Sequence, residues 1–262
     1  MKVSCIQLDM LLGRPDVNYP HAEELIRRTA EKEKPDVILL PELWDVGFFP
    51  KENLEALGDK DCARVIKWAG SLAKELGTAI IAGSVANLCG GKVYNTACVF
   101  DRTGSLIAQY DKTHLFTPMG EHHYFAAGNK VCRFTLDGHS CGLVICYDIR
   151  FPELTRTLTV PGLDILFVVS QWPDIRIPHL RVLTQARAIE NQMYLALCNS
   201  CGKAGGTVYG GSSAVIDPWG TVLCEAGAGE EVVTAACDFS VNEKIRASMH
   251  IFADRRPELY KI

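Results

Sequence analysis

The chain has 262 residues, of which 48% are hydrophobic, and a formal net charge of −4. A chain of this length and apolar content can bury a large core, in one big α/β or all-β domain or in two small ones. The small negative charge gives no electrostatic basis for binding nucleic acid or an anionic membrane surface. Acidic substrates stay open, because a local Arg or Lys overrides so small a net charge.

Targeting and redox signals favour a cytoplasmic protein. The first eleven residues are too short and too polar for a signal peptide. The longest apolar runs have the length of a strand, far short of a membrane span. The eleven cysteines are odd in number, and several lie inside strand-like runs. We therefore expect reduced thiols in the cytoplasm.

The first ninety residues alternate between strand and helix patterns. Apolar residues recur at helical spacing over residues 22–30 and again from Cys62 to Leu76, where Gly77 predicts the end of the helix. Apolar runs predict strands at 3–9, 36–42 and 78–86.

From Lys92 the pattern changes to hairpins. Residues 92–101 and 105–112 flank Arg-Thr-Gly and predict one hairpin, and residues 131–148 predict a second that turns at Asp137-Gly138. The glycine-rich segment 202–213 is expected to be a loop between strands. The other expected elements are a helix from Pro152, a strand at 164–170, a helix at 179–191, a strand at 194–200, a hairpin at 210–226, a strand at 231–239 and a short helix after it.

The order of these elements predicts the fold class. No repeat, low-complexity segment or Ser/Gly linker interrupts it, so residues 1–262 are expected to form a single domain. Interleaved βα units with several hairpins predict an α/β fold, in which strands form layers and helices cover them on the outside.

Three of the expected strands end on a side chain suited to catalysis, and open α/β folds place their ligands at strand ends. These side chains are Glu42, Lys112 and Cys146. A thiol with an ordinary pKa of about 8.5 is only slightly ionised at neutral pH. A neighbouring Lys⁺ stabilises the thiolate, and a carboxylate can accept and return its proton. Taken singly, Glu42 is also explained as a surface strand end, Lys112 as a solvated hairpin residue and Cys146 as a buried structural cysteine.

Three segments, in this order, resemble the signature segments of the nitrilase superfamily, the carbon–nitrogen hydrolases. They read "LLPELWDVGFF", "YDKTHLFTPMGEHHYFAAG" and "GLVICYDIRFPEL", and the similarity runs from the opening strand through "GGSSAVIDPWG". The resemblance implies a four-layer αββα sandwich. It also implies a homodimer, because subunits of the family commonly pair through their outer helices.

The resemblance places the family's Glu-Lys-Cys catalytic triad on Glu42, Lys112 and Cys146, with Glu121 as a supporting second glutamate. Glu42 would take the thiol proton as Cys146 attacks an amide carbonyl carbon, and that proton would leave with the nitrogen as ammonia. Lys112 and the backbone N–H of Tyr147 would stabilise the oxyanion. Glu42 would then activate the water that hydrolyses the thioester. This chemistry requires no metal or organic cofactor.

Within the family, residues 170–202 look most like those of omega-amidases. These enzymes hydrolyse the terminal amide of 2-oxoglutaramate or 2-oxosuccinamate to the 2-oxo acid and ammonia. Such substrates carry a carboxylate at the far end, so we expect a cation opposite Cys146. Arg176 is the candidate for a bidentate clamp, and a plain surface arginine is an equal alternative. Further candidates for substrate-binding residues are Trp172, Phe116 and Tyr124.

Residues beside the triad have structural explanations. We expect Asp148, Arg150 and Glu153 to anchor the turn after Cys146 by ion pairs. His122 and His123 are adjacent and would point to opposite sides of an extended chain, which disfavours joint metal binding.

Two other motifs are weak. Cys198 and Cys201 have CxxC spacing, but the glycine-rich residues after them do not predict a helix, and the chain has no second ligand pair for zinc. A Cys–His hydrolase with His114 as base explains less of the chain than the carboxylate–lysine set.

Other functions compete with the omega-amidase prediction. The same triad serves an N-carbamoyl amidase, a deaminated-glutathione amidase or a nitrilase. A different class is a non-catalytic binding module that retains the fold.

Overall fold

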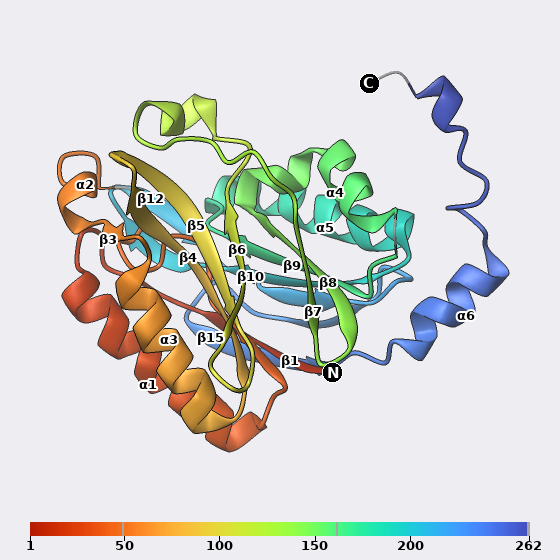
Figure 1. Cartoon of the computed structure of the whole chain (residues 1–262), viewed down its shortest axis with the longest axis horizontal. Coiled ribbons are helices and arrows are strands. Elements are labelled where there is room, and N and C mark those ends of the chain that lie inside the picture. The colour runs from red at the N-terminus through yellow and green to blue at the C-terminus, as the bar shows by residue number, and fades with distance from the viewer. Residues whose placement is uncertain (49, 161, 261–262) are drawn as a thin grey trace.

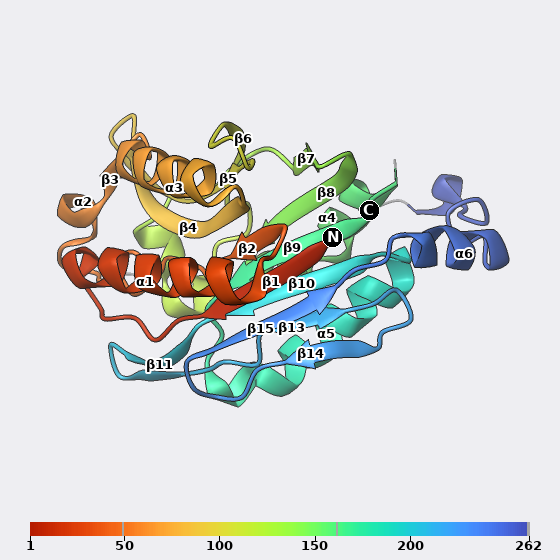
Figure 2. The same cartoon turned by 90° about the horizontal axis from the view of Figure 1, so that it is seen from below.

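Two β-sheets stack face to face, with helices on their outer sides (Figures 1 and 2). The computed structural model describes residues 1–48, 50–160 and 162–260. The first sheet has the strand order β15 (Glu231–Ala236), β1 (Lys2–Gln7), β2 (Val37–Leu39), β4 (Ala79–Cys89), β5 (Lys92–Phe100) and β6 (Leu106–Asp111), with β3 (Asp59–Lys60) beside β4. The second has the order β14 (Val222–Glu225), β13 (Ala214–Ile216), β10 (Tyr194–Asn199), β9 (Ile165–Ser170), β8 (His139–Ile145) and β7 (Cys132–Leu136).

The outer layers are helical. Two helices, α1 (Pro15–Glu33) and α3 (Ala63–Leu76), cover the first sheet, and two others, α4 (Pro152–Thr159) and α5 (Ile177–Asn191), cover the second (Figure 2). The expected four-layer αββα sandwich is therefore confirmed.

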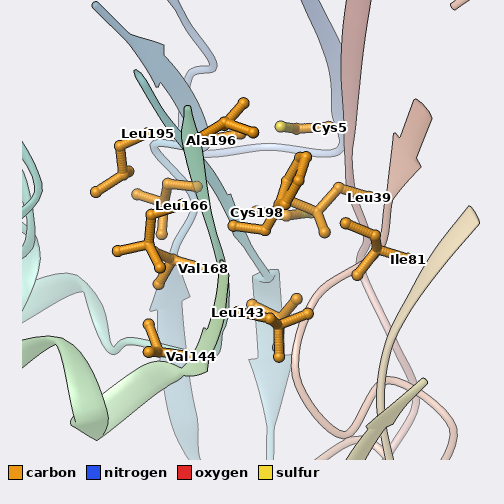
Figure 3. Close-up of a cluster of buried hydrophobic side chains, with 14 of the residues drawn as sticks. Cys5, Leu39, Ile81, Leu143, Val144, Leu166, Val168, Leu195, Ala196 and Cys198 are labelled. Atoms are coloured by element: carbon orange, nitrogen blue, oxygen red, sulfur yellow. The ribbon is translucent and has the colours of Figure 1, made fainter. Parts of the chain in front are cut away.

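Alternation of side chains along the central strands builds two cores at once. In β2 and the residue after it, Val37 and Leu39 face the second sheet, whereas Ile38 and Leu40 face α1 and α3. A strand buried on both faces reads as a continuous apolar run, which is why the pattern at 36–42 predicted it. In Figure 3 the side chain of Leu39 lies between the sheets, within the cluster that also holds Leu143 of β8.

The ends of α3 follow from local chemistry. The carboxylate of Asp59 accepts hydrogen bonds from the backbone N–H groups of Arg64 (2.9 Å) and Val65 (2.8 Å), which stabilises the first turn. The helix ends where Gly77 adopts a φ of +62°, a left-handed conformation that glycine takes without strain. The predicted helix end is confirmed.

Both predicted hairpins are present, and they deliver two of the candidate catalytic residues. β5 and β6 pair antiparallel, so Lys112 follows directly at the end of β6. β7 and β8 are joined at Asp137 and Gly138, whose φ angles of +50° and +84° are both positive, as a two-residue hairpin turn of type I′ requires. Cys146 follows directly at the end of β8.

One prediction of local structure is wrong. The glycine-rich segment at 202–213 is not simply a loop, because it contributes most of a hairpin formed by β11 (Cys201–Ala204) and β12 (Thr207–Gly210). Its glycines concealed the strands, since glycine has low strand propensity. The short helix α2 (Leu54–Leu57) and the strand β3 were not predicted.

The C-terminal part lies beside the sandwich rather than in it. Helix α6 (Ser240–Ser248) and residues 249–260 project away from the two sheets (Figure 1). Over the part of the chain that the structure describes, no helix combines the length and apolar content needed to cross a membrane.

Candidate active site

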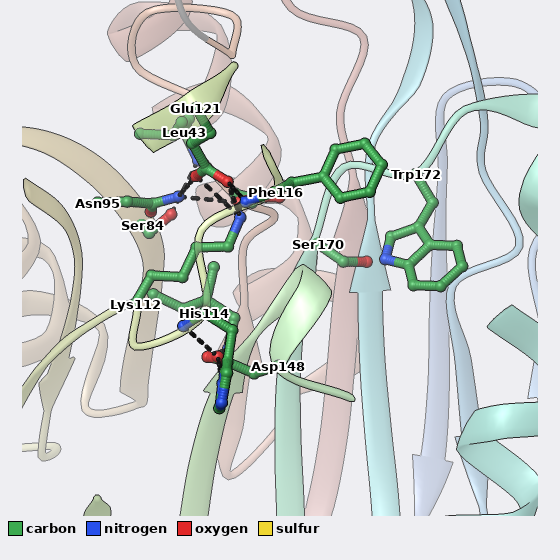
Figure 4. Close-up of polar contacts among 12 residues, drawn as sticks. Leu43, Ser84, Asn95, Lys112, His114, Phe116, Glu121, Asp148, Ser170 and Trp172 are labelled. Carbon is green, nitrogen blue, oxygen red and sulfur yellow. Dashed lines mark hydrogen bonds and ion pairs between the residues drawn. The ribbon is translucent and has the colours of Figure 1, made fainter. Parts of the chain in front are cut away.

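Glu42, Lys112 and Glu121 form one buried charged cluster. Figure 4 shows the contact of Lys112 with Glu121. The ammonium of Lys112 donates to Oε1 of Glu42 at 2.8 Å and to both oxygens of Glu121 at 2.9 Å. Their side chains are at most 1% exposed. Two carboxylates and one ammonium leave a net negative charge, which is buried and needs further donors.

Two neighbours supply such donors. The side-chain amide of Asn95, on β5, donates to Oε1 of Glu42 at 2.8 Å. The backbone N–H of Phe116 donates to Oε2 of Glu121 at 2.6 Å. The other oxygen of Glu42, Oε2, is buried and has no hydrogen-bond partner among the described residues, so it is free to accept a proton. Sequence reasoning missed Asn95, because nothing in the strand pattern distinguishes an inward-facing polar residue from an outward-facing one.

Cys146 stands beside this cluster in an unusual backbone conformation. It opens the short 3₁₀ helix Cys146–Arg150 with a φ of +50°, a region that non-glycine residues rarely adopt. Its thiol lies close enough to the carboxylate of Glu42 and to the backbone N–H of Gln171, which follows β9, for both groups to shift its pKa. A strained residue at a buried polar cluster is typical of functional sites.

The ionisation of these groups is set by burial and by their mutual charges. Burial, followed by the charge of Glu42, raises the pKa of the Cys146 thiol well above its ordinary value, and the lowering effect of Lys112 does not offset this. Burial also raises the pKa of Glu42. Burial alone would lower the pKa of Lys112, but the charges of Glu42 and Glu121 raise it well above the usual range. The thiol is therefore protonated at neutral pH and requires a base, and Lys112 stays cationic.

A cavity opens above Cys146, and most of the predicted substrate-binding residues line it. Phe116, Trp172 and Arg176 face the same space as Cys146 and Tyr147. The guanidinium of Arg176 lies over the ring of Phe116, 4.9 Å from its centroid. Tyr124 is not among the lining residues and packs instead in a cluster with Phe125 and Leu54.

The turn after Cys146 is anchored in a way that differs from the prediction. Asp148 is fully buried and accepts hydrogen bonds from Tyr110 (2.7 Å) and from the backbone N–H of Ile145 (3.0 Å). Its anchoring role is confirmed. In the described part of the chain, Arg150 and Glu153 form no ion pair, so that prediction is wrong for both. Arg150 lines the cavity instead, with its guanidinium 4.4 Å from the centroid of the Trp172 ring.

Two metal-related motifs have structural explanations. His122 and His123 lie in the 3₁₀ helix Glu121–His123 with ring centroids 3.9 Å apart, so the premise of an extended chain was wrong. Cys198 and Cys201 are free and buried, one in β10 and the other in β11. Within residues 1–48, 50–160 and 162–260, no three His, Cys, Asp or Glu side chains are grouped to hold a metal ion.

Sequence comparisons agree over nearly the full length. Residues 2–247 match the family model described as carbon–nitrogen hydrolase. The 2-oxoglutaramate amidase of Bacillus subtilis (strain 168) is 42% identical over 258 residues, which cover 98% of each chain. A Staphylococcus lugdunensis protein named hydrolase in agr operon is 41% identical over 228 residues, covering 86% of this chain and 97% of its own.

Solved structures share the architecture. A CN-hydrolase superfamily protein from Xanthomonas campestris, whose crystal structure has an arsenic adduct in the active site, is 30% identical with a TM-score of 0.90. The match covers 98% of this chain and 97% of that one. The fold class expected from the sequence is thus confirmed by an independent structure.

Proposed function

The chain belongs to the carbon–nitrogen hydrolase family, and we propose that it hydrolyses the terminal amide of 2-oxoglutaramate and of related 2-oxo dicarboxylic acid monoamides. The observation that carries the proposal is the proximity of the Cys146 thiol to the buried Glu42, whose charge raises the pKa of the thiol and whose carboxylate is held by Lys112. A 2-oxoglutaramate amidase is 42% identical over 98% of this chain, and this similarity supports the choice of substrate.

The first half-reaction forms a thioester. Glu42 accepts the thiol proton while the sulfur of Cys146 bonds to the amide carbon, and the carbonyl oxygen becomes an oxyanion. Lys112 and the backbone N–H of Tyr147 stabilise that oxyanion, and each such donor typically lowers the barrier by about 3 kcal/mol. As the tetrahedral intermediate collapses, the C–N bond breaks and Glu42 returns the proton to the nitrogen, which leaves as ammonia.

The second half-reaction releases the acid. Glu42 takes a proton from water as its oxygen attacks the thioester carbon, and the C–S bond then breaks. The thiolate of Cys146 regains the proton from Glu42, and the 2-oxo acid leaves. Glu121 holds Lys112 in place throughout, through its two hydrogen bonds at 2.9 Å.

Arg176 is the proposed clamp for the distal carboxylate. It lines the cavity, and it has no carboxylate partner among the residues that the structure describes. Its guanidinium packs on Phe116, which positions the planar group for bidentate contact. A cation without a counter-ion at a cavity wall is suited to an anionic substrate.

Two further points belong to the proposal. We infer a homodimer that pairs through the outer helices, because Val182 and Ile189, seven residues apart on α5, are 66% and 48% exposed. Sedimentation of the chain and of Val182→Glu tests this, since a dimer through α5 should dissociate in the variant.

We also infer a cytoplasmic location, because all eleven cysteines are free.

The decisive test is product formation from 2-oxoglutaramate. The native chain should release ammonia and 2-oxoglutarate in equal amounts, and Cys146→Ala should lower kcat by about a thousandfold or more. Cys89→Ala is the matched control, because Cys89 is an exposed free cysteine. Unchanged turnover in Cys146→Ala would exclude this mechanism. A native chain that leaves 2-oxoglutaramate intact but cleaves N-carbamoyl amino acids, deaminated glutathione or nitriles would exclude 2-oxoglutaramate as the substrate.

A further inference from the structure

Trp172 is held firmly at the wall of the active-site cavity. It lies just beyond the end of β9, and its backbone N–H donates to Oδ1 of Asn199 at 2.7 Å. The next residue, Pro173, bridges to Tyr209 of β12. The side chain of Trp172 is only 3% exposed and faces the same cavity as Cys146. Its position is therefore fixed by the fold before any ligand binds.

The indole N–H of Trp172 has no acceptor among the described residues, although it is buried. In Figure 4 the edge of the ring that carries this nitrogen is turned toward the side chain of Ser170, whose hydroxyl is itself hydrogen-bonded to Oδ1 of Asn199. Leaving a buried donor unpaired typically costs about 1–3 kcal/mol, so natural proteins usually supply a partner. A donor at a cavity wall finds that partner in a bound ligand.

The neighbouring Gln171 makes an instructive comparison. Both polar atoms of its side chain are also buried without a described partner, and it lines the same cavity. An amide presents one donor group and one acceptor, so Gln171 can accommodate a ligand group of either kind. An indole N–H can only donate. Of the two, Trp172 alone can discriminate an acceptor from a donor.

The charged side chains beside Trp172 also favour a ligand group that accepts a hydrogen bond. The guanidinium of Arg150 lies on the ring of Trp172, and that of Arg176 lies on the ring of Phe116. Burial, and with it the charge of Arg176, lowers the pKa of Arg150, so the two cations repel each other. No Asp or Glu of the described chain lines this cavity. The wall therefore offers positive charge and donors, with no carboxylate to receive an ammonium group.

We propose that Trp172 is a specificity-determining residue whose indole N–H donates a hydrogen bond to the 2-oxo oxygen of the substrate. Arg150, stacked on the same ring, makes that position unfavourable for a positive charge. A 2-oxo group accepts a hydrogen bond, whereas the 2-ammonium of an amino acid amide such as L-glutamine only donates and is positively charged. The site thus selects 2-oxo acid amides over 2-amino acid amides. This inference rests on the proposed function.

The test compares three substrates that differ only at carbon 2. They are 2-oxoglutaramate, L-glutamine and glutaramate, which has no substituent there. Trp172→Phe keeps the ring for stacking and removes the N–H. We expect kcat/KM for 2-oxoglutaramate to fall about tenfold to a hundredfold, and kcat/KM for glutaramate to change by less than about twofold. Trp68→Phe is the matched control, because it removes an indole N–H that bonds to Glu23 on α1, outside the cavity.

Arg150 supplies a second, independent readout. Arg150→Gln should lower the preference for 2-oxoglutaramate over L-glutamine by about tenfold or more, whereas Arg150→Lys, which keeps the charge, should largely preserve it. Thermal unfolding of each variant shows whether it folds.

The outcomes separate two kinds of failure. A Trp172→Phe variant that loses activity equally on 2-oxoglutaramate and glutaramate would overturn the inference and leave the proposed function intact. So would a folded variant with unchanged kinetics. A native chain that does not cleave 2-oxoglutaramate would overturn both.

Discussion

Oδ1 of Asp148, in the turn after Cys146, accepts a hydrogen bond of 3.0 Å from the backbone N–H of His114, two residues after Lys112. The same oxygen contacts Nδ1 of His114 at 2.8 Å, and the other accepts from Tyr110 and Ile145. One buried carboxylate therefore joins the segment that carries the lysine to the segment that carries the thiol. Their relative position does not depend on packing alone.

Replacing this carboxylate should impair both activity and stability. In Asp148→Asn, the new amide nitrogen faces groups that were donating to an oxygen, so buried donors lose their acceptor. We expect the free energy of unfolding to fall by about 2–4 kcal/mol and kcat to fall at least tenfold. Denaturant unfolding and steady-state kinetics check this. A variant with native stability and native kcat would show that the hydrogen bonds of Asp148 are not needed to position the two segments.

Glu121 should affect turnover more than substrate binding. Glu121→Gln removes one of the two negative charges that raise the pKa of Lys112 and replaces an acceptor with a group that also donates. Lys112 would then shift relative to the oxyanion, and we expect kcat to fall by about tenfold to a hundredfold with a smaller change in KM. Glu23→Gln, in the exterior helix α1, is a suitable control. An equal rise in KM with native kcat would contradict the positioning role.

The pH dependence of activity follows from Glu42. Burial raises the pKa of Glu42 above its ordinary value of 4.5. The carboxylate must be ionised to accept the thiol proton, so kcat/KM should fall as the pH drops through a value above 4.5. A neutral amide substrate should be used, so that its own ionisation does not contribute. An acidic limb at or below pH 4.5 would argue against Glu42 as the base.

Asp45 should make stability depend on pH in the opposite sense to an ordinary salt-bridged carboxylate. Burial raises its pKa from 3.8 to about 7, and its Oδ2 has no donor among the described residues. The folded state therefore holds a proton that the unfolded state has released between these pH values. Stability from this group is present below pH 4 or so and is lost as the pH rises to about 7.

Asp45→Asn removes that dependence. The effect of the substitution is the free energy of unfolding of the variant minus that of the native chain. We expect this difference to be about 1–4 kcal/mol more favourable at pH 8 than at pH 4. Denaturant unfolding at the two pH values measures the difference, and Asp254→Asn, at an exposed position, is the control. A substitution whose effect on stability is the same at both pH values would contradict the raised pKa.

Much of the fold could be predicted because its elements have clear periods. The helix from Cys62 to Leu76 and the turn at Asp137-Gly138 each carry a local signal that the structure confirms. The hairpin of β11 and β12 was missed, because its glycines resemble a loop and its pairing is not visible in one strand alone.

The candidate site was predictable only in part. Spacing identified Glu42, Lys112 and Cys146 as strand-end residues, but their convergence depends on which strands pair, and periodicity carries no such information. The family resemblance, and not periodicity, predicted that the three residues converge. The side of the turn on which Arg150 projects was equally inaccessible, so its place beside Trp172 became visible only in three dimensions.

The left-handed backbone of Cys146, with its φ of +50°, has a consequence for engineering. Glycine adopts this conformation without strain, whereas for other residues it typically costs about 1 kcal/mol or more. Cys146→Gly should consequently unfold at a higher temperature than Cys146→Ala, although both lack the sulfur. A library screened for thermal tolerance alone would thus tend to replace Cys146, so engineering this enzyme for higher thermal stability needs a simultaneous selection for turnover.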